Sequence, residues 1–261
     1  MIAVRQARAD PSVAAVVRGY RERTGDSPGP GVIVPLPGRP AQFLEIYLDD
    51  PYRVSTDGGD FERAPEAVVV GASSRHSARL WVQGRIAAFH IAFQPTGFHR
   101  LFGVPMDALA DRGTPVQDLG LRPLDDLVDV VRRQRDFDGR IAASHAWIAR
   151  RLAWSRAGGP VDHVARLIRR GRIAPPVAEM ARRTGLSPRQ LQRIFVGQVG
   201  LAPKLYARTV RFEAVMDARE RDADASWAAL AHRFGYFDQS HLLRDARLFT
   251  GMPGAPMSDP S

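Results

Sequence analysis

The chain has 261 residues, of which 44% are apolar and 25% are charged, a composition typical of folded proteins. It contains no cysteine, which excludes disulfides, thiolate metal sites and cysteine nucleophiles. No run reaches the roughly 18 apolar residues that a membrane helix needs, and the N-terminus lacks the apolar core of a secretory signal. We therefore expect a cytoplasmic protein with one large or two ordinary domains.

Positive charge is concentrated toward the C-terminus. The whole chain has 37 basic and 28 acidic residues, a net charge of +9. Residues 160–261 carry 16 basic and 10 acidic residues, a difference of +6, whereas residues 1–159 carry 21 and 18, a difference of +3. A basic C-terminal part favours a polyanionic partner, although a charge excess alone is also common on solvated surfaces.

The first part of the chain favours strands. Short segments rich in β-branched and aromatic residues are bounded by glycine, proline or aspartate, as strands usually are. These segments are residues 31–36, 43–48, 66–72, 78–84 and 86–94. Residues 25–31 and 55–60 are predicted to be turns or loops because they are rich in glycine, proline, serine and aspartate. The spacing predicts a small barrel or sandwich.

Helical patterns take over after Pro95. The predicted helices are residues 96–103, 105–111, 124–136, 139–154, 161–171 and 175–185. Residues 155–160 form the best linker candidate, because small flexible residues lie there at a change of composition. The expected fold class is α+β, with a strand-rich, barrel- or sandwich-like domain over residues 1–154 that also carries helices. An all-α domain with two helix-turn-helix units is expected over residues 161–261.

Two segments of the C-terminal part repeat each other. Residues 177–185 match residues 227–235 with a shift of 50, and Ser187 aligns with Asp238 after one extra turn residue. Glycine can take the left-handed conformation that ends a helix. Serine and aspartate can accept hydrogen bonds from the free N–H groups that begin the next one. The repeated pattern of helix, glycine, cap and helix predicts two helix-turn-helix units.

The second helix of each unit has an apolar side and a polar side. Successive residues of a helix are about 100° apart. In the first unit, the polar outward side carries Arg189, Gln192 and Arg193, with Gln190 at the flank. In the second unit, it carries Ser240, Arg244 and Arg247, with His241 at the flank. Leu191, Ile194, Phe195, Leu242, Ala246 and Phe249 are predicted to be buried. Arginine can pair with guanine and glutamine with adenine in a major groove, so both helices are candidates for reading bases.

Two ordinary helix pairs with solvated faces would give a similar pattern. Repetition of the same design on a basic segment makes DNA binding the favoured interpretation. Residues 203–222 are long enough for a rigid helix between the units. Arg208 and Arg211 within it are candidates for phosphate contacts or for structural roles, and the structural role is favoured.

The repeat resembles the C-terminal domain of AraC/XylS-type transcription regulators over roughly residues 161–255. The resemblance rests on S-x-R-x-L-x-R-x-F from Ser187, G-x-x-P from Gly200 and G-[FY]-x-D-Q-S-H from Gly235. It implies a seven-helix domain whose two recognition helices enter successive major-groove segments of double-stranded DNA. The DNA-contacting residues that it implies are Arg189, Gln190, Gln192, Arg193, Ser240, His241, Arg244 and Arg247.

This sequence departs from the family pattern in the second unit. Ala246 replaces the usual phenylalanine, Leu248 stands where a basic residue is common, and the order of residues after Gly251 differs. These departures favour the first unit for base reading. The second unit is then expected to hold phosphates, which position a protein without specifying sequence.

Residues 69–119 loosely resemble the N-terminal domain of one AraC-type subgroup, which implies effector sensing, dimerisation or both. Tyr47, Trp81, Phe89 and Phe93 are candidates for lining a ligand pocket, but at strand spacing they are more typical of a plain core. The partners left open are a small-molecule effector, RNA polymerase and a second copy of the chain. No membrane, cofactor or metal is expected.

An enzymatic role for the N-terminal part is a minor alternative. His76, His90 and His99 lack the tight spacing of metal ligands, and His90 lies in an apolar strand, where a hydrogen-bonded core role is favoured. The sequence contains no nucleophile elbow, phosphate loop or H-E-x-x-H motif. A protein-interaction module that kept the fold but lost DNA binding is a second alternative. The favoured function is a sequence-specific bacterial transcription regulator, with activation and repression both open.

Overall fold

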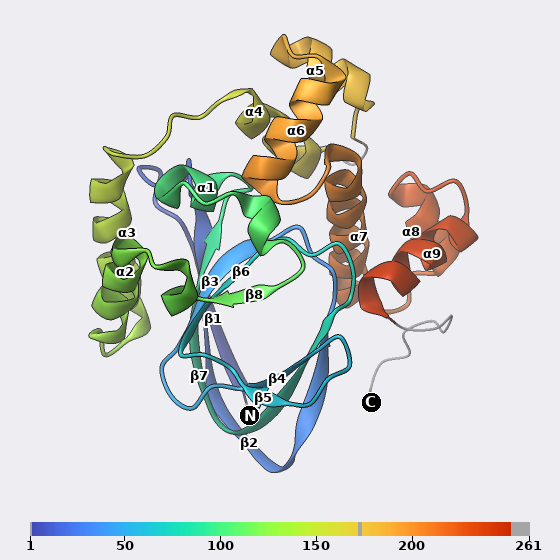
Figure 1. The fold of residues 1–261 in the computed structure, drawn as a ribbon. Coiled ribbons are helices and arrows are strands. Elements are labelled where there is room, and N and C mark those ends of the chain that lie inside the picture. Colours follow the sequence, from blue (N-terminus) through green and yellow to red (C-terminus); the bar gives the residue numbers. More distant parts are fainter. Residues whose placement is uncertain (1, 172–173, 252–261) are drawn as a thin grey trace.

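A computed structural model describes residues 2–171 and 174–251 of the chain. Its N-terminal part is built on one antiparallel sheet with the strand order β1-β2-β7-β3-β6-β8, in which β4 joins β5 to β7 (Figure 1). The strands are β1 Ile2–Arg8, β2 Val17–Leu36, β3 Gln42–Tyr47, β4 Arg53–Thr56, β5 Glu62–Arg63, β6 Ala67–Val70, β7 Ala78–Phe93 and β8 Gly113–Pro115. The strand-rich prediction is confirmed, but this sheet is open, with β1 and β8 at its ends.

Two long strands, β2 and β7, form the frame of the sheet. They pair along most of their length, from Val17 opposite Phe93 to Leu36 opposite Ala78. The other edge of β7 is shared, because β3 pairs with one end of it and β4 with the other. The sheet can therefore bend between the two ends of β7, as Figure 1 shows.

The prediction of a turn at residues 25–31 is wrong, because this segment lies inside β2. Pairing with β7 shifts register between Ser27 and Val32, so the extra residues bulge out while the strand continues. Gly29 and Gly31 have φ values of 103° and 87°, which glycine adopts at little cost. The glycine and proline residues here mark an irregularity in a strand instead of its end.

Helices cover the N-terminal sheet and complete its core. They are α1 Gly97–Phe102, the 3-10 helices η1 Met106–Leu109 and η2 Val116–Leu119, α2 Arg122–Arg132 and α3 Phe137–Leu152. Leu44 and Ile91 of the sheet belong to the same buried cluster as Leu127 of α2 and Ile148 of α3. Phe89 and Phe93 are buried as well, which confirms the core interpretation for them, whereas Tyr47 is buried but also lines a cavity.

The C-terminal part is entirely helical in the described residues. It contains α4 Pro160–Arg170, α5 Val177–Thr184, α6 Pro188–Val199, α7 Pro203–Arg221, α8 Trp227–Arg233 and α9 Gln239–Thr250. The α+β class is thereby confirmed. Residues 160–171 and 174–251 supply six helices where the resemblance implied seven, and the chain after Gly251 lies outside the described residues. Within residues 2–171 and 174–251, no helix combines the length and apolar character needed to cross a bilayer.

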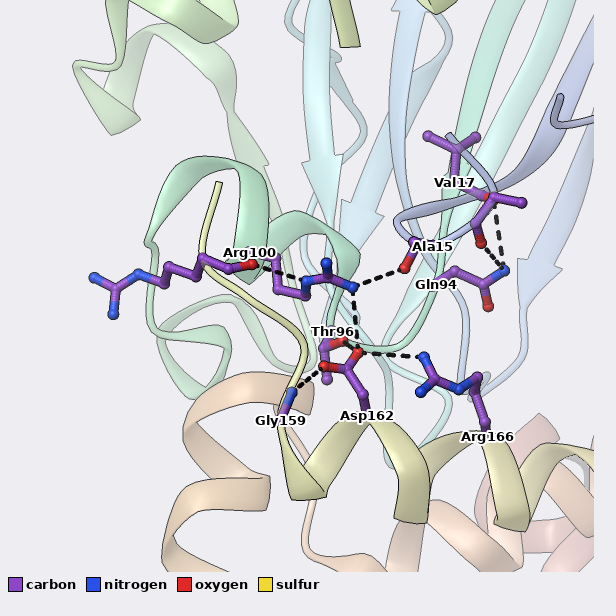
Figure 2. A network of polar contacts seen from close by, with 10 residues as sticks. Ala15, Val17, Gln94, Thr96, Arg100, Gly159, Asp162 and Arg166 are labelled. Atoms are coloured by element: carbon purple, nitrogen blue, oxygen red, sulfur yellow. Dashed lines mark hydrogen bonds and ion pairs between the residues drawn. The ribbon is translucent and has the colours of Figure 1, made fainter. Parts of the chain in front are cut away.

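The two parts meet around a buried carboxylate (Figure 2). Asp162, in the first turn of α4, is only 3% exposed. Its side chain accepts hydrogen bonds from the Thr96 hydroxyl and, at 2.8 Å, from the Gly159 N–H. Arg100 and Arg166 lie 3.6 and 3.7 Å from the same carboxylate. This network ties α4 to α1, although the predicted domain boundary at residues 155–160 stays a prediction.

A second buried carboxylate makes stability depend on pH. Burial by itself raises the pKa of Glu45, but His90, Arg23 and Arg39 lower it from 4.5 to about 2. Because the folded pKa is the lower one, Glu45 stabilises the fold above about pH 4.5, and this contribution is lost as the pH falls toward 2. The shift corresponds to about 3 kcal/mol.

We therefore expect Glu45→Gln to flatten the fall in stability between pH 5 and pH 2.5. Urea unfolding of both proteins at several pH values measures this, with the exposed Glu62→Gln as the control. A Glu45→Gln protein whose stability falls with pH as steeply as that of the wild type would contradict the assignment.

Candidate nucleic-acid interface

The first helix-turn-helix unit consists of α5 and α6. α5 ends at Gly185, whose φ of 68° lies in the left-handed region. Ser187 then begins α6, where its hydroxyl accepts the Gln190 N–H at 3.3 Å. In return, the Gln190 side-chain oxygen accepts the Ser187 N–H at 3.0 Å. This reciprocal capping box fixes the direction in which α6 leaves the turn.

The second unit, α8 and α9, repeats this construction. The Ser226 hydroxyl caps α8 by accepting the Ala229 N–H at 3.1 Å. The Asp238 carboxylate caps α9 by accepting the His241 N–H at 2.7 Å. Both predicted caps, Ser187 and Asp238, are therefore confirmed, and α7 lies between the two units (Figure 1).

The predicted DNA-contacting residues lie mostly on the outer faces of α6 and α9. The exposed ones are Arg189, Gln190, Gln192, Arg193, Ser240, Arg244 and Arg247. His241 is half-buried, with its ring against the edge of Tyr236 at 5.1 Å between centroids. The Gln190 side-chain oxygen is already engaged in the cap of α6. These two residues are therefore less free to contact DNA than the sequence pattern predicted.

The outward arginines carry free charge. Arg189, Arg193, Arg244 and Arg247 have no ion-pair partner among residues 2–171 and 174–251. The four α6 residues Arg189, Gln190, Gln192 and Arg193 line one open groove. A groove with unpaired guanidinium groups and side-chain amides on an exposed helix suits the edges of bases and the phosphates beside them.

Comparison with known proteins decides what this C-terminal region is. A family described as a helix-turn-helix domain, of the AraC type, matches residues 180–255. The C-terminal region is an AraC-type helix-turn-helix domain. The chain is accordingly a DNA-binding transcription regulator. The matched residues include α6, α7, α8 and α9 in full, and thus both predicted recognition helices of the AraC-type domain.

A solved structure shows a similar fold over most of the chain. The apo form of a ToxT variant from Vibrio cholerae aligns over 94% of this chain and 96% of its own, with 7% identity and a TM-score of 0.50. Unsaturated fatty acid-bound wild-type ToxT from Vibrio cholerae aligns over 98% and 97%, with 6% identity and a TM-score of 0.46. The AraC-like transcriptional activator CuxR aligns over 83% and 86%, with 13% identity and a TM-score of 0.21. No curated protein sequence matches the chain.

The inner faces of the two recognition helices anchor the AraC-type domain. Leu191 and Phe195 of α6 and Leu242 and Phe249 of α9 are buried as predicted, whereas Ile194 and Ala246 are only partly buried. The two helices contribute to separate apolar clusters, one in each unit. Each unit of the AraC-type domain thus has its own core.

The second unit contains a buried acid that the sequence pattern did not predict. Asp245 of α9 is fully buried and accepts a hydrogen bond from Arg208 at 2.6 Å and from the Tyr236 hydroxyl at 3.2 Å. Arg211 lies 3.7 Å from the same carboxylate oxygen that accepts the Tyr236 hydroxyl, and it stacks on the Tyr236 ring at 3.9 Å. Burial and the Asp245 charge raise the pKa of Tyr236. Arg208 and Arg211 therefore join α7 to α9, which confirms their structural role.

Phe237 was also missed by the sequence pattern. It is the extra turn residue of the second unit, and its side chain is 93% exposed, directly before the cap of α9. With the shift of 50 residues, Leu186 aligns with Tyr236, and both pack against the cores of their units. An apolar residue before a cap usually packs onto the helix in that way. Phe237 instead exposes its ring to solvent directly before the cap of α9.

The N-terminal part holds the last turns of both recognition helices. The Gln42 side-chain amide donates to the Val199 carbonyl of α6 at 2.8 Å. The Gly38 N–H donates to the Phe249 carbonyl of α9 at 2.6 Å, and the His76 N–H donates to Leu248 at 3.2 Å. Helix ends leave such carbonyls without partners inside the helix. The N-terminal part thus supplies these partners and restrains both recognition helices of the AraC-type domain.

The three histidines considered as metal ligands have other partners. Nδ1 of His76 lies 2.8 Å from the Leu36 carbonyl oxygen, and Nδ1 of His99 lies 2.8 Å from that of Val104. His90 lies 3.1 Å from both Glu45 and Arg23, which confirms its hydrogen-bonded core role. Across residues 2–171 and 174–251, no three histidine or acidic side chains gather as a metal site would require.

Proposed function

We propose that this regulator reads DNA with α6 and α9 together. Arg189, Gln192 and Arg193 of α6 contact base edges in one segment of the major groove, and Ser240, Arg244 and Arg247 of α9 contact base edges and phosphates in the next segment. The observation that carries this proposal is the repetition of one capped helix with unpaired outward arginines, twice within the AraC-type domain. Gln190 contacts DNA through its side-chain amide N–H groups, since its oxygen caps α6. His241 contacts DNA from the flank of α9.

We further propose that the N-terminal domain, residues 1–154, modulates this binding in response to a small-molecule effector. The restraint of both recognition helices by Gln42, Gly38 and His76 supports this role, because a change in the N-terminal part would reach both helices at once. The regulator acts in the bacterial cytoplasm, with RNA polymerase and a second copy of the chain as further partners.

The test is binding of the purified full chain to genomic DNA fragments of its host at several salt concentrations. Contacts with phosphates release counterions, so affinity should fall steeply as salt rises. A protein-interaction module that has lost DNA binding would enrich no fragment, and an apolar interface would respond little to salt. Absence of enrichment at every salt concentration would reject the proposal.

Asp107 should weaken DNA binding in the wild type. This exposed residue of η1 lines the groove beside α6 together with Arg189 and Arg193, where a carboxylate repels approaching phosphates. We expect Asp107→Asn to raise DNA affinity about two- to fivefold at low salt, which corresponds to less than about 1 kcal/mol. Fluorescence anisotropy measures this, with the exposed Asp118→Asn on η2 as the matched control. An equal gain in DNA affinity for both variants would show that the affinity depends on the net charge of the protein and not on the position of Asp107.

Phe237 should contribute to DNA affinity and not to folding. Its exposed ring precedes the N-terminal end of α9, where an apolar side chain can meet a thymine methyl group. We expect Phe237→Ala to lower operator affinity about three- to tenfold, with a free energy of unfolding within about 0.5 kcal/mol of the wild type. Unchanged affinity would remove Phe237 from the interface.

A further inference from the structure

A cleft of about 880 Å³ lies between the first strands and the helices α4 and α7. Residues of β1 and β2 form one wall, and Arg169 of α4 with Glu213 and Asp217 of α7 belong to the other. Its charged lining consists of Arg8, Arg18, Arg21, Arg23, Arg39 and Arg169 against Glu45, Glu213 and Asp217. Six positive charges against three negative ones leave a net charge of +3 at the cleft.

Internal pairing does not neutralise this charge. Glu45 pairs with Arg23 at 2.8 Å, and Glu213 pairs with Arg169 at 3.0 Å. No ion pair within residues 2–171 and 174–251 involves the guanidinium groups of the remaining arginines of the cleft. These remaining arginines are Arg8, Arg18, Arg21 and Arg39. Arg39 rests on the Phe43 ring, 5.4 Å from its centroid, which orients the group without balancing its charge.

The arginines line one cleft that stays open to solvent, where Arg8, Arg18 and Arg21 are exposed and Arg39 is half-buried. Burial, followed by the charge of Arg169, lowers the pKa of Arg18. Burial also lowers the pKa of Arg39, with the charges of Arg23 and Arg21 acting in the same direction. Like charges that line one cleft disfavour one another, and an anion bound between them relieves this repulsion. The cleft is therefore built for a negatively charged occupant.

A mainly apolar chamber, whose lining also includes Glu62, Arg63, Asp111 and Arg112, adjoins the charged cleft. A second cavity of about 300 Å³ shares Leu36, Val70 and Leu80 with it and extends past Tyr47 and Val54. Arg39 and Glu45 border both spaces. The combination of a charged opening and an apolar interior suits a molecule with an anionic head and an apolar body.

We propose that this cleft binds an organic phosphate, with its doubly charged head among Arg18, Arg21 and Arg39 and its apolar body in the adjoining chamber. The planar guanidinium fork matches phosphate oxygens in pairs. A single carboxylate would balance only one of the unpaired charges. The acidic Glu213 and Asp217 on the α7 wall make the cleft unsuitable for a DNA backbone. This inference rests on the proposed effector role of the N-terminal domain.

Calorimetric titration of the full chain with octyl phosphate, octanoate and inorganic phosphate tests the inference. The first two probes share a tail and differ in the head, and the third lacks the tail. We expect octyl phosphate to bind at least about tenfold more tightly than either of the others. Equal or tighter binding of octanoate, or no saturable binding of octyl phosphate up to about 10 mM, would overturn the proposal.

Variants locate the site. Arg18→Ala and Arg39→Ala should each weaken octyl phosphate binding about tenfold. Arg150 is an exposed arginine of α3 outside the cleft lining. The control Arg150→Ala should therefore change the binding less than about twofold. Circular dichroism checks folding, and Arg39→Lys replaces Arg39→Ala if the latter unfolds. Equal losses in Arg150→Ala would contradict the assignment. DNA binding by the protein without ligand is measured in parallel. If the protein binds DNA but does not bind octyl phosphate, this inference is rejected and the proposed function stands.

Discussion

Replacing Arg189 or Arg193 with alanine should weaken binding to the preferred DNA site by about 1–3 kcal/mol for each residue, or roughly five- to 150-fold. Both side chains project from the outer face of α6 and have no ion-pair partner within residues 2–171 and 174–251. Their removal therefore takes away base contacts without disturbing the apolar face, where Leu191 and Phe195 pack. The free energy of unfolding should change by less than about 0.5 kcal/mol.

Competition binding on the preferred site and on unrelated DNA separates base contacts from phosphate contacts. If an α6 arginine reads a base, its removal should reduce the ratio between the two affinities, whereas removal of a phosphate-binding arginine should reduce both affinities equally. Arg182→Ala is the matched control, because Arg182 lies on α5, is exposed and pairs with Glu179 at 2.7 Å. If both α6 variants retain wild-type affinity and preference, the assignment of base reading to α6 is wrong.

Asp245→Ala should destabilise the second helix-turn-helix unit by about 3–5 kcal/mol. The substitution leaves Arg208 and the partly buried Arg211 without the carboxylate that both face, and it removes the partner of the Tyr236 hydroxyl. An unpaired charge left in a poorly solvated place costs far more than the loss of one surface ion pair. Because α9 is held to α7 through this cluster, DNA binding should fall together with stability.

Urea unfolding monitored by circular dichroism measures the loss. Arg247→Ala on the same helix is the control, because its exposed side chain should contribute less than about 0.5 kcal/mol. Asp245→Asn keeps the size of the side chain and should recover only part of the stability, since an amide cannot balance two guanidinium groups. An Asp245→Ala protein as stable as the wild type would show that the buried cluster does not hold α9 in place.

The helix-turn-helix units were predictable because their signals are local. Gly185 ends a helix, and Ser187 and Asp238 begin others, each through hydrogen bonds that span only a few residues. Helical periodicity likewise placed Leu191 and Leu242 inside. Asp245 escaped prediction because an acid in a helix normally faces water, and only the approach of α7 supplies its partners.

The N-terminal sheet was harder to predict because its pairing is not local. Strand β1 has six exposed residues out of seven and thus no alternation that marks a strand. The segment at 25–31 contains turn residues, yet β7 continues beside the flanking parts of β2 and holds them in one strand. The arginine cleft brings Arg8, Arg39 and Arg169 together from distant parts of the chain, which no spacing in the sequence indicates.

Selection of binding sites from a random DNA library by the purified full chain tests the central claim, that both recognition helices read DNA together. The account predicts one motif with two short conserved blocks about one helical turn, roughly 10 base pairs, apart. Loss of conservation in one block should follow Arg189→Ala combined with Arg193→Ala, and loss in the other should follow Arg244→Ala. A motif with a single conserved block that survives the α6 substitutions unchanged would contradict the account.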